Sequence, residues 1–247
     1  MDGLFREAGY APLAPGWPGE ADTVEETRRQ PERVAGKGID DVVAHYAQII
    51  RGLDAPPITI GHSFGGLMVQ RLLGQDLAAA AVAIDPAPIK GVLILPPSEL
   101  KVASVALRKP ANRNLAVALT REQFRYGFGN ALPAQESDEL YDRWAIPSPG
   151  KTLFEAAFAN FTPNSPAKVN TQNKTRGPLL VTAGGKDHTV PHIVSTSTRR
   201  LYHRSPAITD FRESPRRCSA GSSSARFSGS GTSSGRSAGS ARQAITR

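Results

Sequence analysis

A serine stands between two glycines in the sequence GHSFG at residues 61–65. An apolar, β-branched stretch at 57–60 precedes it, and a helix-like stretch at 65–73 follows it. A Gly-x-Ser-x-Gly sequence between a strand and a helix is typical of a nucleophile elbow, whose tight turn exposes the serine hydroxyl. The alternative is an ordinary glycine-rich turn, but the flanking elements favour the elbow. Ser63 is therefore the candidate nucleophile, with Gly61 and Gly65 as the small neighbours.

The residue after the serine supplies a second part of acyl-transfer chemistry. A helix that starts at the elbow directs the positive end of its dipole toward the site. The backbone N–H of Phe64 would then point at the oxyanion that develops when a carbonyl carbon is attacked. We therefore expect Phe64 to contribute one oxyanion donor.

A candidate acid follows a later buried stretch. The run LLVTAGGKD at 179–187 reads as a strand, a glycine turn and an aspartate, which makes Asp187 the candidate acid. The alternative is that Asp187 is a turn aspartate that caps the following helix. Asp85, which follows the apolar stretch 79–84, is a weaker alternative acid.

The elements that position these residues alternate between strand and helix. Apolar residues with helical spacing predict a helix over 39–53, and Asp40 and Asp41 suit the dipole in its first turn. Strands are predicted at 10–14, 57–60, 79–84, 179–183 and 207–212, with further helices at 65–73 and 193–203. Alternating strands and helices with short connections predict an α/β fold with a mostly parallel central sheet.

Two stretches depart from this alternation. The mixed, Pro- and Asn-rich stretch within 97–176 has helical segments but no clear strand, so we interpret it as a mainly helical lid inserted between two halves of the core, 1–96 and 177–213. Residues 214–247 contain eleven serines and five glycines. Such a composition buries too little apolar surface to offset its ordering entropy, which predicts a disordered tail.

Composition excludes several classes of protein. The net charge is +8, but six arginines of the tail supply most of it, so no basic folded face indicates nucleic-acid binding. The single cysteine excludes an intrachain disulfide, and no cluster of His, Asp and Glu has metal-ligand spacing, so we expect neither metal nor cofactor. No apolar run is long enough for a membrane span and no secretory signal is evident; we expect a cytoplasmic protein.

The sequence resembles the α/β-hydrolase superfamily over residues 3–213. The resemblance rests on GHSFGG at 61–66, GGKDHTVP at 184–191 and FREAGYAPLAPGWPG at 5–19. It implies a central parallel sheet, a mainly helical lid, a Ser-Asp-His triad without a cofactor, and a small-molecule ester as substrate. Esterase chemistry through an acyl-enzyme on Ser63 is the function that it implies.

The sequence departs from the family pattern at the histidine. The family places its triad histidine just after the last core strand, where this chain has Pro215-Arg216-Arg217. No catalytic histidine is identified, because none of the five has the expected place: His203 precedes the last strand, His188 and His192 share a loop with the acid, and His62 points away from the serine in a normal elbow. The fifth is His45.

A second departure lies at the front. The family's first buried strand and its His-Gly oxyanion segment precede a helix that residues 4–9 resemble, and this chain starts inside that helix. We therefore expect one central strand of the sheet to lack a partner on one side. A truncated start with a replaced terminus and a degenerate family member with a genuine tail both fit these features.

Two functions follow. The first is a serine hydrolase of carboxylic esters, with activity impaired by the missing base. The second is an inactive relative that binds ligands without turnover. In either case the lid aromatics could line an acyl pocket or simply pack the lid on the core: Phe124, Tyr126, Phe128, Tyr141, Trp144, Phe154, Phe158 and Phe161.

Overall fold

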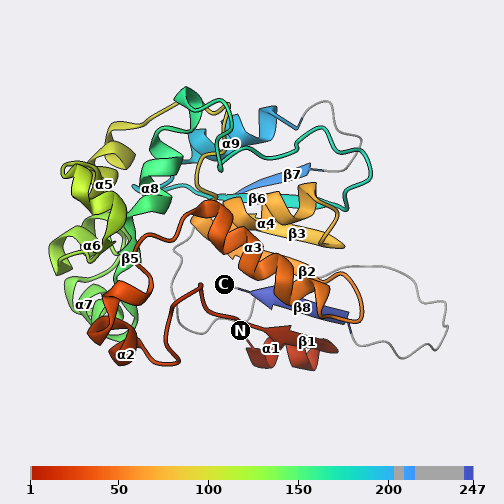
Figure 1. Ribbon diagram of the computed structural model, residues 1–247, viewed down its shortest axis with the longest axis horizontal. Helices are drawn as coiled ribbons and strands as arrows, with labels where there is room; N and C mark the ends of the chain where they lie inside the picture. The colour runs from red at the N-terminus through yellow and green to blue at the C-terminus, as the bar shows by residue number, and fades with distance from the viewer. Residues whose placement is uncertain (1, 203–208, 215–241, 247) are drawn as a thin grey trace.

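The computed structural model describes residues 2–202, 209–214 and 242–246. A single parallel sheet lies beside core helices, and a group of helices covers one end of it (Figure 1). The sheet has six strands in the order β1-β8-β2-β3-β6-β7. Every neighbouring pair in it is parallel. The predicted α/β fold with a parallel sheet is thus confirmed.

Five of the six strands described in this sheet agree closely with those expected from the sequence, and β8 is the exception. Since all run the same way, their carboxyl ends meet at one edge of the sheet, which is where βα-loops place functional groups. The bounds are β1 Tyr10–Leu13, β2 Ile58–His62, β3 Ala80–Ile84, β6 Leu179–Gly184, β7 Thr209–Ser214 and β8 Arg242–Thr246.

Helix α3 (Ile39–Arg51) shows why the predicted helix forms where it does. The side chain of Asp41 accepts a hydrogen bond from the N–H of Gly38 at 2.7 Å, which satisfies a first-turn donor. That bond holds the pKa of Asp41 below its ordinary value, with Lys151 contributing. The apolar face of α3 is buried through Ile39, Val42, Val43, Tyr46 and Ile50.

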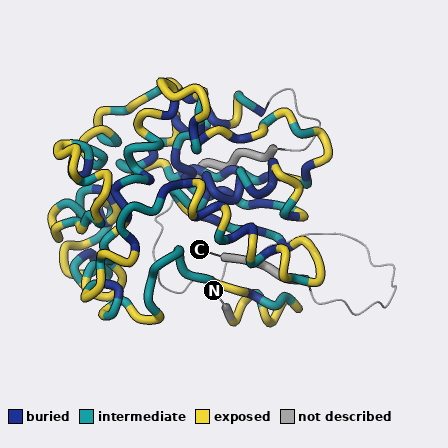
Figure 2. Tube along the Cα trace, in the orientation of Figure 1, coloured by how far each residue is buried: buried dark blue, intermediate teal, exposed yellow. Residues whose placement is uncertain are grey.

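The core lies between the sheet and helices α3, α4 (Phe64–Gly74) and α9 (His192–Arg200) (Figure 2). Ala81 and Ala83 of β3 are fully buried. Their small side chains leave room for α4, whose Leu67, Met68 and Leu73 are at most 1% exposed. Close packing of α4 on β2 and β3 therefore fixes the turn that joins β2 to α4. A further helix, α1 (Asp2–Glu7), precedes β1.

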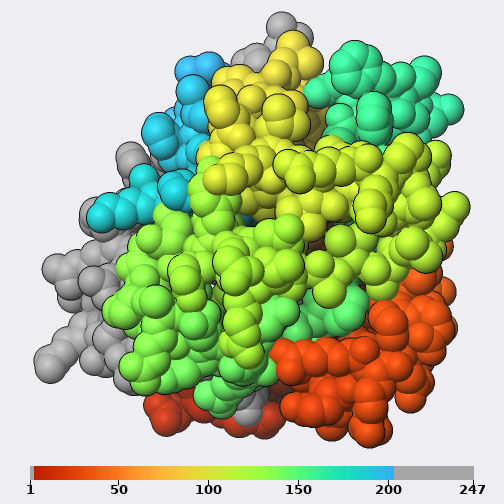
Figure 3. Space-filling view, turned by 90° about the vertical axis from the view of Figure 1, so that its left-hand side faces the viewer, coloured from red at the N-terminus to blue at the C-terminus, as the bar shows by residue number. Residues whose placement is uncertain are grey.

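The lid (residues 97–176) consists mainly of helices and covers the face seen in Figure 3. Its one difference from the sequence prediction is a two-residue antiparallel ladder, β4 (Ala116–Val117) with β5 (Ser148–Pro149). Its α-helices are α5 (Pro97–Leu107), α6 (Arg121–Gly127), α7 (Ala134–Trp144) and α8 (Gly150–Ala157). Two 3₁₀ turns described in the lid are Pro110–Asn114 and Ala159–Phe161, and a third, Pro31–Arg33, follows α2 outside the lid.

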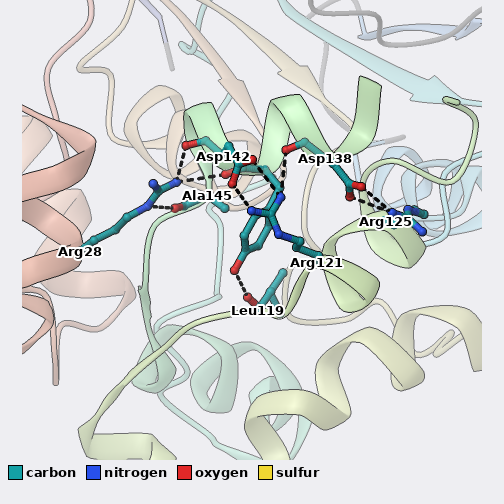
Figure 4. A network of polar contacts seen from close by, with 8 residues as sticks. Arg28, Leu119, Arg121, Arg125, Asp138, Asp142 and Ala145 are labelled. Atoms are coloured by element: carbon teal, nitrogen blue, oxygen red, sulfur yellow. Dashed lines mark hydrogen bonds and ion pairs between the residues drawn. The ribbon is translucent and has the colours of Figure 1, made fainter. Parts of the chain in front are cut away.

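Helix α2 (Val24–Arg29) clamps the end of α7 (Figure 4). The guanidinium of Arg28 donates to the carbonyl oxygens of Tyr141, Asp142 and Ala145 at 2.8–3.0 Å. These carbonyls lie at the carboxyl end of a helix, where four of them lack helical partners. Beyond this clamp, Arg121 pairs with Asp142 and Arg125 with Asp138. The lid is thereby joined to the segment that follows β1.

Strand β8 corrects one expectation. The sequence predicted a central strand without a partner on one side, but β8 lies between β1 and β2 and pairs with both. Within the tail 214–247, for which the sequence predicts disorder, Ser214 ends β7 and residues 242–246 form β8; over the rest of the tail this prediction lies outside the described residues. An open strand edge presents unpaired N–H and C=O groups, and an extended segment from elsewhere in the chain satisfies them.

None of the helices in the described parts of the chain is both long enough and apolar enough to cross a membrane.

Candidate active site

Ser63 lies at the junction of β2 and α4 with backbone angles φ 53° and ψ −117°. A positive φ is rare for a residue other than glycine and costs free energy unless the surroundings impose it. Three backbone bonds impose it: the Ser63 N–H donates to Ile84 O at 3.0 Å, and its carbonyl accepts from Leu67 and Ala87. The turn therefore has the geometry of a nucleophile elbow.

Glycine is required in the elbow because the backbone segments on either side of Ser63 lie very close to each other. A Cβ on Gly61 would lie 2.2 Å from the carbonyl oxygen of Gly65, which no side chain tolerates. The sequence prediction missed Gly66, where a Cβ would lie 2.8 Å from the Cβ of Pro86. The repeated glycine in GHSFGG was the available signal. Gly65 contributes the carbonyl that approaches Gly61 and is half-buried in the first turn of α4.

The hydroxyl of Ser63 is not used to cap α4, although Ser63 occupies the N-cap position. Serine at this position ordinarily accepts a hydrogen bond from the first turn. Phe64 is the first residue of α4, so its N–H is one of the donors that have no helical carbonyl partner. Among the described residues, the hydroxyl of the half-buried Ser63 has no hydrogen-bond partner, and the N–H of Phe64 beside it is a first-turn donor of α4.

Asp187 lies in the loop after β6, at the same edge of the sheet as Ser63. Its Oδ1 accepts hydrogen bonds from the N–H groups of Thr189 and Val190 at 2.7 and 2.8 Å. One oxygen therefore shapes the loop, although α9 begins only at His192 and is not capped by it. The other oxygen has no hydrogen-bond partner among the described residues.

Asp85 and His62 meet Asp187 at this edge. One ring nitrogen of His62 and one carboxylate oxygen from each aspartate lie within 4.8 Å of one another. Asp85 is buried and accepts a hydrogen bond from the N–H of Gly184. Burial and the negative charge of Asp187 raise the pKa of Asp85, while the Gly184 bond and His62 oppose the rise.

Sequence reasoning missed this cluster because its members lie far apart in the chain. The sequence analysis considered only ligand spacing along the chain, which these three residues lack. It did not foresee that the exposed His62 lies near two carboxylates. Ligand atoms at these separations could surround a divalent cation.

The other described histidines are occupied elsewhere. A ring nitrogen of His45 lies 3.2 Å from Gly16 O, and Nδ1 of His188 lies 3.2 Å from Tyr126 O. His192 begins α9 on the surface. His203 lies outside the described residues. None of the described histidines makes a hydrogen bond to Asp187.

A lid carboxyl approaches the acid. Oε2 of Glu99, on α5, is buried with no hydrogen-bond partner in the described chain. Burial, with a contribution from Asp187, raises the pKa of Glu99 to about 7. A carboxyl that titrates near neutral pH beside a candidate acid is typical of functional sites.

Residues of the lid form hydrogen bonds with the loop that carries Asp187 (residues 185–191, the acid loop). The Thr189 hydroxyl donates to Gly127 O at 2.8 Å, and the Asn130 amide donates to Lys186 O at 2.8 Å. The ring of Tyr126 lies 5.0 Å from that of His188. The acid loop is thus held between the sheet and the lid.

The lid aromatics divide between the two roles proposed for them. Phe124 stacks on Phe128 and contacts Tyr141 edge-on, and Phe154 stacks on Phe158, so these pairs pack within the lid. Side chains exposed by about half or more are Phe128, Trp144, Phe158 and Phe161. Of the eight, Tyr126 has a ring contact with the acid loop.

A surface pocket of about 470 Å³ lies elsewhere, lined by Arg71, Gln75 and residues 168–172. Arg71 and Gln75 belong to the far end of α4, roughly 12–18 Å along the helix from Ser63. None of the candidate site residues lines this pocket. The candidate active site is therefore defined by the positions of the functional groups around Ser63 and not by this pocket.

Comparison with known families decides the lineage. A profile described as the alpha/beta hydrolase family matches residues 2–212. The chain belongs to the alpha/beta hydrolase family. In this alpha/beta hydrolase, the candidate residues Ser63 and Asp187 both lie at the carboxyl edge of the parallel sheet. None of the curated protein sequences matches this alpha/beta hydrolase.

Solved structures similar to this alpha/beta hydrolase include named esterases and hydrolases. Polyneuridine aldehyde esterase matches with 15% identity and a TM-score of 0.54, over 86% of this chain and 82% of that one. A pyrethroid hydrolase from Sphingobium faniae JZ-2 matches with 16% identity and a TM-score of 0.51, over 87% and 81%. Tomato methylketone synthase I, complexed with 2-tridecanone, matches with 12% identity and a TM-score of 0.55, over 87% and 81%. At these identities the matches support the fold.

Proposed function

We propose that this alpha/beta hydrolase cleaves carboxylic esters of small or acyl type through an acyl-enzyme on Ser63. The observation that carries the proposal is the positive φ of Ser63 together with its hydroxyl, which does not cap α4 and has no partner among the described residues. The surrounding packing maintains a conformation that would otherwise relax, which is typical of a site kept for chemistry.

The residues have separate roles in the proposed reaction. The Ser63 oxygen attacks the acyl carbon and the alkoxide leaves with a proton; water then attacks the acyl-enzyme and releases the acid. The N–H of Phe64 stabilises the oxyanion in both steps. Asp187 orients the base that moves the proton, through the oxygen that Thr189 and Val190 leave free.

The base limits the rate that we expect. Since no described histidine hydrogen-bonds to Asp187, deprotonation of Ser63 lacks an oriented partner in the described chain. Loss of a triad member ordinarily lowers kcat by about 10⁴ to 10⁶ while leaving binding and oxyanion contacts in place. We therefore expect turnover several orders of magnitude below that of a complete triad.

The same observation favours a second function, a fold that binds esters or acids without turnover. This function predicts occupancy of the site by small apolar acids and no product release. It shares the lineage and the elbow with the first function and differs only in the chemical step.

A fluorophosphonate probe tests both. We expect slow labelling at Ser63, located by peptide mass spectrometry, abolished in Ser63→Ala and unchanged in Ser104→Ala, which alters a serine on α5. A panel of p-nitrophenyl esters measures turnover. Labelling without turnover on the panel supports the ligand-binding function. Absence of labelling in folded protein rules out the acyl-enzyme.

A further inference from the structure

The sheet contains a strand that comes from a distant part of the chain. Strands β1 and β2 do not pair with each other; β8 lies between them and is parallel to both. Ala244 has Pro12 as its register partner on one side and Ile58 on the other. Some 180 residues separate β2 from β8 in the chain. The position next to the strand that carries Ser63 is therefore filled from the C-terminal part of the sequence.

Without β8, two strand edges would face each other across the width of one strand. β1 has no other strand partner in the described parts of the chain, and β2 would keep only β3. Both edges would present unpaired N–H and C=O groups, which bind extended segments readily. An extended segment between β1 and β2 can form hydrogen bonds with both strands and so pair the backbone groups of both edges.

The segment that fills the position differs from its surroundings. Residues 241–247 are the longest run free of serine and glycine after residue 213. Ile245 and Thr246 are β-branched, which favours a strand, whereas the preceding Ser- and Gly-rich stretch disfavours one. The sequence thus has one short segment with strand propensity, and it follows a Ser- and Gly-rich stretch with low strand propensity.

The connection is long enough for the segment to come from the same chain. β7 and β8 are four strand steps apart in the sheet, about 19 Å at ~4.8 Å per step. The return along parallel strands adds about 17 Å at ~3.3 Å per residue. Residues 215–241 can span up to about 90 Å when extended, so the intervening chain readily bridges the distance.

We propose that the gap between β1 and β2 is a strand-binding site, and that its occupant is this chain's own segment 242–246. Occupancy supports the elbow, since β8 pairs with Ile58, Thr59 and Ile60, and Ile60 is three residues before Ser63. The proposal stands apart from the proposed function, because it concerns the sheet whether or not Ser63 is acylated.

Engineered disulfides test the occupant. In a Cys218→Ser background, which removes the single natural cysteine, Ile58→Cys is combined with Ala244→Cys, its register partner. The matched control combines Ile58→Cys with Gln243→Cys, which is one residue out of register with Ile58; a shift of one residue changes the face of a sheet that a position occupies. After mild oxidation, intact mass and non-reducing electrophoresis distinguish bonds within one chain from bonds between chains.

We expect an intrachain bond in the 58/244 pair and at least tenfold less in the 58/243 pair. A bond between copies would assign the site to the segment of a second copy and overturn the assignment to the same chain. Folded protein that forms no bond in the 58/244 pair, or bonds equally in both pairs, would overturn the strand site itself.

Hydrogen exchange provides an independent readout. Ala244→Pro removes an N–H from the ladder, which a strand between two neighbours does not tolerate. We expect the amides of residues 58–60 to exchange at least tenfold faster in this variant, with no change in Ser230→Pro, which lies outside β8. Unchanged exchange of these amides in Ala244→Pro contradicts the proposal.

Discussion

The carboxylate of Asp85 accepts a hydrogen bond from the backbone N–H of Gly184, which joins the end of β3 to the end of β6. Gly184 precedes the acid loop, so this bond sets where that loop leaves the sheet. It also brings Asp85 and Asp187 to the same edge, together with His62. Because β3 and β6 are neighbours in the sheet, the buried carboxylate of Asp85 can bond Gly184 and so help to position the loop that carries Asp187.

Replacing Asp85 should separate its charge from its hydrogen bond. Asp85→Ala leaves the Gly184 N–H without its acceptor, and we expect a loss of about 2 kcal/mol in the free energy of unfolding. Asp85→Asn keeps an acceptor oxygen and removes the charge. Because burial raises the pKa of Asp85, ionisation disfavours the native state and stability falls as pH rises through that pKa.

Urea denaturation at pH 5 and pH 8 measures these effects. We expect Asp85→Asn to be at least as stable as the natural chain at pH 8, whereas Asp85→Ala is less stable at both pH values. The exposed Asp54 supplies the control variant Asp54→Asn. Equal losses for Asn and Ala at pH 8 would show that the carboxylate charge itself is needed.

Gly61→Ala should damage the elbow. The new Cβ would lie 2.2 Å from the carbonyl oxygen of Gly65, and this contact is with backbone that cannot rotate away. We expect a loss of about 3 kcal/mol, at the upper end of the usual range for overpacking. Gly3→Ala is the control, since no atom lies within 4 Å of its Cβ position and it lies in helix α1.

Thermal and urea unfolding of the two glycine variants, with probe labelling at Ser63, provide the measurement. A Gly61→Ala protein as stable as Gly3→Ala would mean that β2 and α4 can separate freely. That result would contradict the tight turn on which the role of Ser63 depends.

Glu99→Gln should remove a pH dependence of stability. The pKa of Glu99 is raised from 4.5 to about 7, so between these values the native state holds a proton that the unfolded state has lost. Stability therefore falls as pH rises from about 4.5 to 7 and stays low above it. The upper limit of the loss is about 3.5 kcal/mol at ~1.4 kcal/mol per pKa unit.

We expect Glu99→Gln to match the natural chain below pH 4.5 and to exceed it in stability at pH 8. Chemical denaturation over pH 4 to 8 measures the difference. Glu139→Gln, a change at an exposed position of α7, should leave the pH profile unaltered. A profile for Glu99→Gln parallel to that of the natural chain would place the titration elsewhere.

Arg28→Ala should loosen the lid. Its guanidinium donates to three carbonyl groups at the end of α7, and their loss exposes helix ends that are otherwise satisfied. We expect a loss of about 2 kcal/mol and faster proteolysis between α7 and α8. Arg29→Ala, at the neighbouring exposed position, is the matched control; equal sensitivity of the two variants would contradict the clamp.

The sequence by itself determined most of the helices and strands and the candidate site residues. Periodicity placed α3 and the strands to within a few residues, because burial of one helix face or a short apolar run is a local property. The elbow and Asp187 were readable for the same reason: a turn with a fixed steric requirement must show its glycines in adjacent positions.

Only the tertiary structure decided which distant residues meet. Asp85, His62 and Asp187 come together because three parallel strands end at one edge, and no spacing along the chain encodes that meeting. The burial that raises the pKa of Glu99 likewise exists only in the folded chain. Composition also could not predict the position of β8, because a Ser- and Gly-rich stretch predicts disorder. The unpaired backbone groups of β1 and β2 can be satisfied by any extended segment that reaches them, and here β8 pairs with both.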